Sequence, residues 1–313
     1  MNNTIDPLLE AGIPSFDFPD NYFSLSDDGS YYIIGYPAPV SSQESDVILN
    51  IPSTYNGKPV KEISDYAFCN LNRKIVSIYI PDSICKIGIE FAVETEKLVS
   101  IIVDKNNKYF KSEGNCLIEI STNKLIKGTN ISVIPDYVNI IGRHSFNGCC
   151  DLSSVVIPNS VSKIDVGAFS ASGLKSINIP ESVTEIGESA FWCCENIESI
   201  SIPSSVVTLG SWAFYGCENL VSIIIPESVI NIGAECFTSC TNLKNVILKC
   251  SSNAFNKYKF NGCPNIEVIY VIEGKGWNKE DVISSSDGDK SIEILPSKAS
   301  LVVKKVKVKS FKI

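Results

Sequence analysis

The chain has 313 residues, a formal net charge of −8 and a sequence pI of about 4.9. This acidic balance offers no clustered basic face for the phosphates of nucleic acid. The 44% apolar content excludes a disordered chain, and no run approaches the ~18 apolar residues of a membrane helix. We therefore expect a folded protein with no nucleic-acid partner and no membrane insertion.

The N-terminal stretch MNNTIDPLLEAGIPSFDFPDNYF has neither the basic start nor the continuous apolar segment of a secretory signal peptide. Three explanations stay open at this point. The protein stays inside the cell, it leaves by a route without a leader, or the leader is absent from this chain.

A repeat begins irregularly near residue 60 and becomes regular farther along the chain. VKEISDYAFCNL supplies Val60 and Phe68 as an edge unit. IPDSICKIGIEFAVETEKL keeps the later proline and glycine positions, but it places Phe91 one residue early and has Thr95 where a cysteine stands later. Irregular terminal units are expected because they cover the open end of a repeat core.

Five successive units then follow one another at a nearly constant step in the low twenties. Each starts with isoleucine and proline, at Pro135, Pro158, Pro180, Pro203 and Pro226. Eleven positions after each proline is a phenylalanine, at Phe146, Phe169, Phe191, Phe214 and Phe237. Such a period is typical of a solenoid, in which every turn buries its apolar positions against the turns beside it.

Short β-branched segments such as SINI and SISI close the units and predict strands, stacked at ~4.8 Å into one long parallel sheet. A glycine such as Gly210 follows the second apolar position in most units, which indicates a positive φ or a close backbone approach. Asp165 replaces this glycine in one unit and favours the positive-φ interpretation. We expect mostly strand and loop, with little helix.

The unit I-P-x-x-V-x-x-I-G-x-x-A-F-x-x-C-x-x-L-x-x-V-x-I resembles the BspA-like class of leucine-rich repeat. The resemblance implies a leucine-rich-repeat solenoid with a period of ~23 residues. It divides the chain into an N-terminal β-rich cap (1–44), a repeat array (45–271) with a hairpin insertion (104–128), and a C-terminal region (272–313).

The C-terminal region loses the repeat after Val271 and reads as a loop-rich cap followed by a basic tail strand, ASLVVKKVKVKSFKI. Its alternation suits an edge strand guarded by lysines. The alternative is a recognition tail for export or anchoring.

Five of the 12 cysteines lie three positions after the repeat phenylalanine or its equivalent: Cys149, Cys194, Cys217, Cys240 and Cys263. Ser172 takes this place in a shortened unit. A thiol behaves as a small buried hydrophobe, so we predict buried thiols in a reduced setting. No Cys-x2-Cys pair indicates zinc, and consecutive equivalents in a ladder cannot all form disulfides. We expect no metal and no cofactor.

The single histidine, His144, occupies the same variable slot as Ser189, Trp212 and Glu235, and we expect it at the surface. Nucleophilic catalysis needs a base in a defined pocket, and glycine-rich phosphate-binding motifs are absent from the sequence. We predict no catalytic residues and no enzyme.

Period-2 alternation exposes two rows of residues along the strands. The first row is mostly serine: Ser77, Ser100, Ser154, Ser176, Ser199, Ser222, Asn245 and Val268. The second row is Tyr79, Ile102, Val156, Asn178, Ser201, Ile224, Ile247 and Tyr270. Exposed apolar side chains often mark partner surfaces, although strands favour β-branched residues whatever they face. We predict that the second row, on the concave face, binds a ligand.

A second candidate lies near the phenylalanine turn, where Trp192 and Tyr215 occupy equivalent slots one layer apart and Trp212 is close. These rings could hold a sugar or a partner loop, but we favour packing between layers.

The sequence therefore predicts a monomeric, non-catalytic recognition protein for a protein or glycan ligand. Members of the family it resembles are found on the surfaces of bacteria and parasitic protists, where they are associated with adhesion to host matrix proteins and cells. The resemblance implies a cell-surface or secreted, adhesin-like binder. The alternative is a cytoplasmic protein–protein interaction scaffold, which the missing signal peptide and the many thiols favour.

Overall fold

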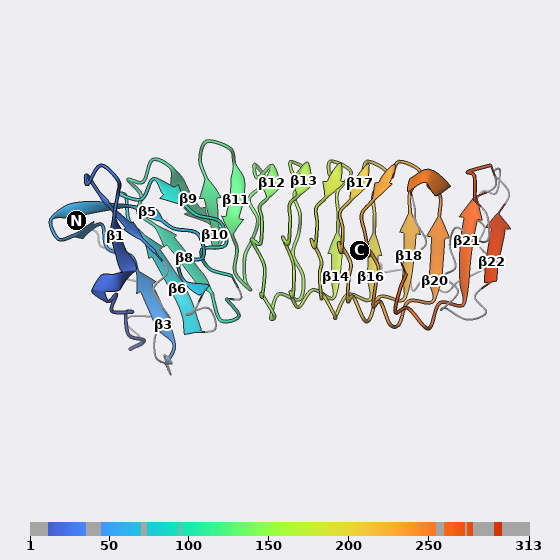
Figure 1. Ribbon diagram of the computed structural model, residues 1–313, viewed down its shortest axis with the longest axis horizontal. Helices are drawn as coiled ribbons and strands as arrows, with labels where there is room; N and C mark the ends of the chain where they lie inside the picture. The colour runs from blue at the N-terminus through green and yellow to red at the C-terminus, as the bar shows by residue number, and fades with distance from the viewer. Residues whose placement is uncertain are drawn as a thin grey trace.

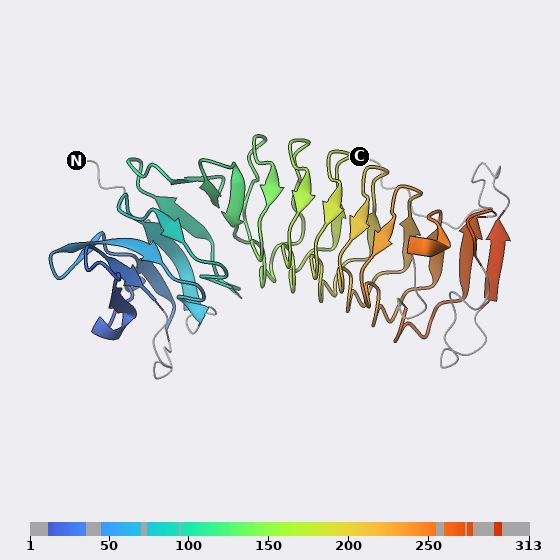
Figure 2. The same cartoon turned by 45° about the horizontal axis from the view of Figure 1, so that its top comes forward.

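A computed structural model describes residues 12–35, 45–69, 74–93, 95–254, 260–272 and 274–277, and the backbone of 291–295. The chain winds into an elongated solenoid whose turns lie side by side along one axis (Figure 1). Figure 2 shows the row of turns bending along an arc. The described residues form four sheets and two short 3-10 turns, Asp20–Tyr22 and Ser252–Ala254, without an α-helix. The predicted repeat solenoid, almost entirely strand and loop, is confirmed.

The N-terminal end is a five-stranded sheet that joins the first hairpin to the first turns of the solenoid. Its strands are β1 (Phe23–Leu25), β2 (Tyr32–Ile34), β4 (Thr54–Tyr55), β5 (Lys58–Ile63) and β7 (Lys86–Ile87). The β1–β2 hairpin is antiparallel, and β2 pairs in parallel with β5. Aromatic rings fill this end of the core: the Phe18 ring lies edge-on to Phe16 and Tyr22, with centroids 4.9 and 5.6 Å away.

The strands that close the units form two parallel sheets, so the prediction of one long sheet is wrong. The first sheet contains β3 (Val47–Asn50), β6 (Ile75–Ile80) and β8 (Ser100–Val103). The second contains β14 (Ser176–Asn178), β16 (Ser199–Ser201), β18 (Ser222–Ile225), β20 (Asn245–Leu248), β21 (Val268–Ile272) and β22 (Ser291–Leu295). The hairpin insertion lies between the two sheets in the chain. Val156, which precedes β14, joins the second sheet through an isolated parallel β-bridge to Asn178.

An eight-stranded sheet that the sequence reasoning did not anticipate runs along the other side of each turn. It begins with the antiparallel strands β9 (Phe110–Glu113), β10 (Cys116–Glu119) and β11 (Lys124–Lys127). It continues in parallel with β12 (Ile140–Ile141), β13 (Lys163–Ile164), β15 (Glu185–Ile186), β17 (Thr208–Leu209) and β19 (Asn231–Ile232). Because β11 pairs with β12, the predicted hairpin insertion provides the first strands of this sheet.

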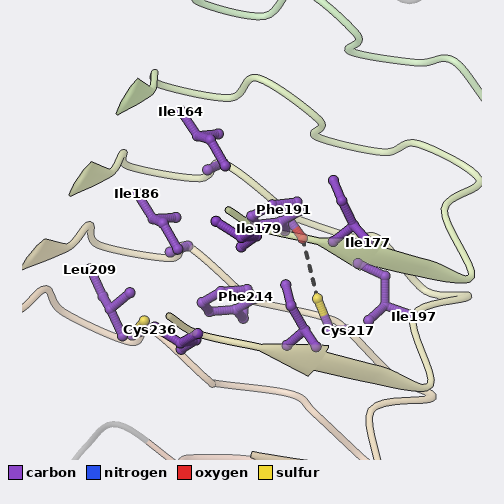
Figure 3. Packing of buried hydrophobic residues seen from close by; sticks show 14 of the residues in the cluster. Ile164, Ile177, Ile179, Ile186, Phe191, Ile197, Leu209, Phe214, Cys217 and Cys236 are labelled. Atoms are coloured by element: carbon purple, nitrogen blue, oxygen red, sulfur yellow. Dashed lines mark hydrogen bonds between the residues drawn. The ribbon is translucent and has the colours of Figure 1, made fainter. Parts of the chain in front are cut away.

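Each regular turn places one phenylalanine in the core, and these rings stack along the solenoid. The rings from Phe146 to Phe237 are fully buried, with adjacent centroids 5.1 to 5.4 Å apart and planes within 9° of parallel. Figure 3 shows Phe191 and Phe214 among isoleucines from neighbouring turns. The ring spacing is close to the ~4.8 Å between paired strands, so each repeat in the sequence corresponds to one layer.

The repeat glycine is required because the backbone of the preceding turn lies close to it, and not because it adopts a positive φ. A Cβ on Gly210 would overlap the backbone nitrogen of Glu188 in the preceding turn. Positive φ falls two positions after the glycine, with values from 49° to 56° at His144, Ser189, Trp212 and Glu235. The interpretation based on Asp165 is therefore wrong, because in its unit the positive φ of 61° belongs to Gly167.

The ladder cysteines are buried, as predicted, and four of their five thiols donate to phenylalanine carbonyls of the preceding turn, whereas Cys149 lies next to the Gly128 carbonyl. The Sγ–O pairs are Cys194–Phe169 (2.9 Å), Cys217–Phe191 (3.2 Å), Cys240–Phe214 (3.2 Å) and Cys263–Phe237 (3.0 Å). The Ser172 hydroxyl lies 3.3 Å from Cys194 Sγ, which places it in the same ladder. Burial raises the pKa of the Cys194 thiol to about 12, so the thiol stays protonated.

The hydrophobic core is divided in two at β10. Alternate side chains of a strand point to opposite faces, so Cys116 and Ile118 join the core of the repeat array, whereas Leu117 joins the N-terminal core. The hairpin therefore separates the regularly packed core of the repeat array from the irregularly packed N-terminal core.

Strand β22 corrects the prediction that the repeat is lost after Val271. Val268 pairs in parallel with Ser291, one repeat length later in the chain, and Val271 pairs with Ile294. Trp277 lies between these strands in the sequence and is buried, and its Nε1 donates to the Cys250 carbonyl at 3.1 Å. The predicted basic tail strand, residues 299–313, lies outside the described residues.

Candidate ligand-binding face

The structure brings most of the second predicted row into register on the outward side of the six-stranded sheet. Asn178 bridges Val156 and pairs with Ser201, while Ile247 pairs with Ile224 and Tyr270. Together with Val133 of the preceding unit we call this surface the strand face: Val133, Val156, Asn178, Ser201, Ile224, Ile247 and Tyr270. The remaining two predicted residues, Tyr79 and Ile102, pair with each other in the separate three-stranded sheet.

Exposed apolar side chains lie towards both ends of the strand face. Val156 is 82% exposed and Ile224 is 45% exposed, with the exposed polar residues Asn178 and Ser201 between them. Val133, 72% exposed, was missed in the sequence because the hairpin separates its unit from β8. Its position two places before a repeat proline, which it shares with Val156, is the signal that identifies it.

Ile247 is not exposed as predicted, because it lies between two large side chains. Ile224 and Tyr270 flank it in register, one strand spacing away on either side, and only 9% of its surface is accessible. Tyr270 is half-buried. The accessible apolar surface therefore comes from Val133, Val156 and Ile224.

The serine row is exposed only along the regular array. Ser154, Ser176 and Ser199 are exposed and Ser222 is half-buried. Ser77 is fully buried, contrary to the prediction, because β6 is covered on both faces from Ile75 to Ile78. The neutral polar surface thus accompanies the apolar residues of the strand face from Val156 onward.

Charged residues flank this neutral strip on the side where the strands begin. Lys175, Glu198, Lys244 and Glu267 are exposed, and their backbones are linked from turn to turn through Val221 by hydrogen bonds of 2.9 to 3.3 Å. An uncharged centre with a charged margin is the usual arrangement of a protein-binding surface.

Tyr79 is engaged within the fold. Its hydroxyl donates to Asp104 at 3.0 Å, and burial, followed by this bond, raises the pKa of Tyr79 to about 12. A residue held in this way is less suited to a ligand than the exposed side chains of the strand face.

The aromatic edge forms contacts between layers, in line with the packing interpretation. The Trp192 and Tyr215 rings stack with centroids 6.3 Å apart and planes 14° from parallel. Trp212 is bound to Glu235 of the next turn, with Nε1 3.2 Å from Oε2. Both tryptophans are nevertheless about two-fifths exposed, at 40% and 38%.

His144 is not a surface residue as predicted. Its side chain is 20% exposed, and Nε2 lies 3.3 Å from Glu90 Oε1. Burial lowers the pKa of His144, although the Glu90 carboxylate acts in the opposite direction. The reason is topological: the hairpin brings the turn of Glu90 close to the turn of His144, although the two are far apart in the sequence.

Comparison with known families decides the classification of the repeat. Residues 48–139 and 139–267 match the BspA type leucine rich repeat region, in six copies. The chain belongs to this family. No curated protein matches the chain.

Two solved bacterial protein structures share the fold. A leucine-rich repeat protein from Eubacterium ventriosum is 23% identical with a TM-score of 0.65, over 82% of this chain and 67% of that one. The pneumococcal vaccine antigen PcpA is 20% identical with a TM-score of 0.52, over 78% of this chain. This BspA-type chain spans only 56% of the pneumococcal protein.

The BspA-type family and the fold together support a repeat-based binding protein, and proteins of this repeat class are typically non-catalytic. Among the described residues, no group of three or more His, Cys, Asp and Glu side chains could hold a metal ion. The same residues include no helix long and apolar enough to cross a bilayer.

Proposed function

We propose that this protein is a non-catalytic, monomeric recognition module that binds a protein or glycan ligand through the strand face. The observation that carries the proposal is the strip of exposed Val133, Val156 and Ile224, with neutral polar side chains between them and charges at the margin. Exposed apolar side chains of this kind on a soluble fold mark partner surfaces.

A protein ligand fits this strip better than a glycan. Valine and isoleucine side chains gain from burial against apolar partner residues, whereas sugars are held mainly by aromatic rings and directional hydrogen bonds. The strand face carries one aromatic side chain, the half-buried Tyr270, whereas the exposed Trp192 and Trp212 lie at the separate aromatic edge. That edge is therefore the second candidate surface, and it suits a glycan ligand better than the strand face does.

For the location, we propose the cell surface or the extracellular space, with an adhesin-like role. Family membership supports this proposal, and the pneumococcal structural neighbour is described as a vaccine antigen. The competing proposal is an intracellular scaffold, supported by the 12 free cysteines, eight of them buried. Labelling of intact source cells with a membrane-impermeant reagent separates the two, because only a surface protein is labelled before lysis.

The strand face is tested with a charged double variant and a matched control. Val156→Asp with Ile224→Asp places two carboxylates in the strip. Val207→Asp with Ile230→Asp makes the same changes at residues that are 38% and 71% exposed beside the eight-stranded sheet. Binding to purified matrix proteins and glycans is measured for both.

We expect the strand-face variant to keep its melting temperature and to bind at least ~30-fold more weakly, as for the loss of two contacts of ~1–2 kcal/mol each. The control variant should bind like the wild type. Equal affinities for the two variants would contradict the assignment of binding to the strand face, and weaker binding by a Trp192→Ala variant alone would favour the aromatic edge.

A further inference from the structure

One layer of the solenoid lacks the phenylalanine turn. Leu125 is in register with Ile141, yet the chain from Leu125 to Ile134 is much shorter than the equivalent segment from Ile141 to Ile157. After β11 the chain passes Gly128, whose backbone nitrogen donates to the Ser145 carbonyl at 2.8 Å. A side chain on Gly128 would overlap the Phe146 ring, so the chain crosses here in place of the missing turn.

The missing turn leaves a cavity of about 220 Å³ between the two packing regions. One wall comes from the irregular turn that contains Glu90 and Phe91, and the opposite wall from the regular turn that contains Arg143 and His144. The hairpin contributes Lys127 between them. The interruption of the repeat therefore creates the cavity.

Most charges around the cavity are already paired. Glu90 Oε1 accepts from Arg143 Nε at 3.0 Å and lies 3.3 Å from His144 Nε2. Lys124 pairs with Asp165 at 3.3 Å. The His144 ring is held against Gly167, where a Cβ would overlap it. These groups shape the wall and keep its polar atoms in place.

Lys127 differs from these groups because no carboxylate of the described residues pairs with it. The residue is 2% exposed, and its Nζ has one long contact, 3.5 Å from the carbonyl of Asn147. Burial lowers the pKa of Lys127. An ammonium offers three donors, and a buried one without an anion is costly. Lys127 is therefore a buried amine at the wall of the cavity, and a carboxylate bound beside it would stabilise its charged form.

The remaining wall is apolar, with Ile87, Ile89, Ala92, Val93 and Ile126. A ligand that fits both walls needs a single negative charge and a short apolar body. Phosphate is a poor match, because it lacks an apolar part and its second charge would face Glu90 and Glu119.

We propose that this cavity is a binding site for a small aliphatic monocarboxylate, whose carboxylate accepts from Lys127 Nζ while its carbon chain lies against the isoleucine wall. The site is separate from the strand face and does not depend on the function proposed for it. Charge-assisted hydrogen bonds to a desolvated lysine are the strong kind, so the carboxylate supplies most of the affinity.

The proposal is tested by calorimetry or ligand-detected NMR on the full chain with butyrate, butyramide and inorganic phosphate. We expect saturable butyrate binding and at least ~10-fold weaker binding of butyramide, which has the same shape without the charge. Phosphate should bind more weakly than butyrate. Absence of saturable butyrate binding, or equal binding of acid and amide, would overturn the proposal.

Two variants locate the site. Lys127→Met keeps the length of the side chain and removes the charge, and should weaken butyrate binding at least ~10-fold. Lys175→Met, at an exposed position, is the matched control and should bind like the wild type. Ala92→Leu narrows the cavity while Lys127 is kept, and it should also weaken butyrate binding. This variant tests the location of the site if the Lys127→Met protein does not fold. Unchanged affinity in a folded Lys127→Met or Ala92→Leu protein would contradict the assignment.

Discussion

The regular array and the N-terminal region fill their cores in different ways. From Phe146 to Phe237 the rings of successive layers are parallel within 9°. In the N-terminal region, Phe68 and Phe91 also belong to successive turns, but their rings meet at 76° with centroids 6.4 Å apart. A strict repeat makes equivalent side chains stack, whereas an interrupted repeat leaves each ring to pack against whatever lies beside it.

This difference has an energetic consequence. In the array each layer contacts only its neighbours, so stability is close to a sum of layer and interface contributions. Damage to one layer is therefore expected to affect mainly that layer and the two beside it.

The largest effect is expected from Phe214→Ala. The ring is fully buried between Phe191 and Phe237, and emptying such a site costs ~3–5 kcal/mol. Urea unfolding measures the change, with Glu218→Ala as an exposed control that should stay within ~0.5 kcal/mol. Similar midpoints for the two variants would contradict the layer register.

A smaller effect is expected from Gly210→Ala, and it separates two roles of glycine. The new methyl group would meet the backbone of the preceding turn, and overpacking of this kind costs ~1–3 kcal/mol. Gly57→Ala in the turn between β4 and β5 has open space but a φ of +75°, and should cost ~1 kcal/mol. A loss at Gly210 that is smaller than the loss at Gly57 in thermal unfolding would contradict the close approach of the layers at the repeat glycine.

The sequence was sufficient for the layers, because Phe214 and Cys217 recur at fixed offsets and each offset has one structural position. The sequence was misleading at Asp165, because the preference of aspartate for a positive φ suggested that conformation there, whereas Gly167 adopts it. The eight-stranded sheet could not be foreseen, because strands such as Glu185–Ile186 are only two residues long and carry no alternation to detect.

The cysteine ladder gives the next prediction. Cys217→Ala leaves the Phe191 carbonyl without its thiol donor and should cost ~1–2 kcal/mol in urea unfolding. Cys217→Ser keeps a donor, as Ser172 does naturally, and should cost less. A serine variant that is less stable than the alanine variant would show that this position requires an apolar atom and not a donor.

The smallest effect concerns pH. Burial raises the pKa of Cys217 well above its usual value of 9.0, so the folded chain keeps the proton that the unfolded chain releases. The contribution of this thiol is complete below pH 9 and is lost as the pH rises towards the folded pKa. Between pH 8 and 10, stability should therefore fall by ~1 kcal/mol more in the wild type than in Cys217→Ser. Identical pH dependence would mean that the thiol ionises in the folded state.

The candidate site was only partly visible in the sequence. Alternation placed Val156, Asn178 and Ile224 correctly, because strands in register repeat their side-chain direction. It could not show that Ile247 is screened by its neighbours, which depends on their size in the sheet. His144 was misjudged because the hairpin that brings Glu90 to it is a long-range contact without a local pattern.

Footprinting of a complex tests the central claim, that the strand face is the binding surface, most directly. The free protein and the protein saturated with its partner are oxidised by hydroxyl radicals, and protection is mapped by mass spectrometry. We predict protection of Val133, Val156 and Ile224, with Val207 and Ile230 beside the eight-stranded sheet unchanged. Protection of Val207 and Ile230 with an unprotected strand face would contradict the account.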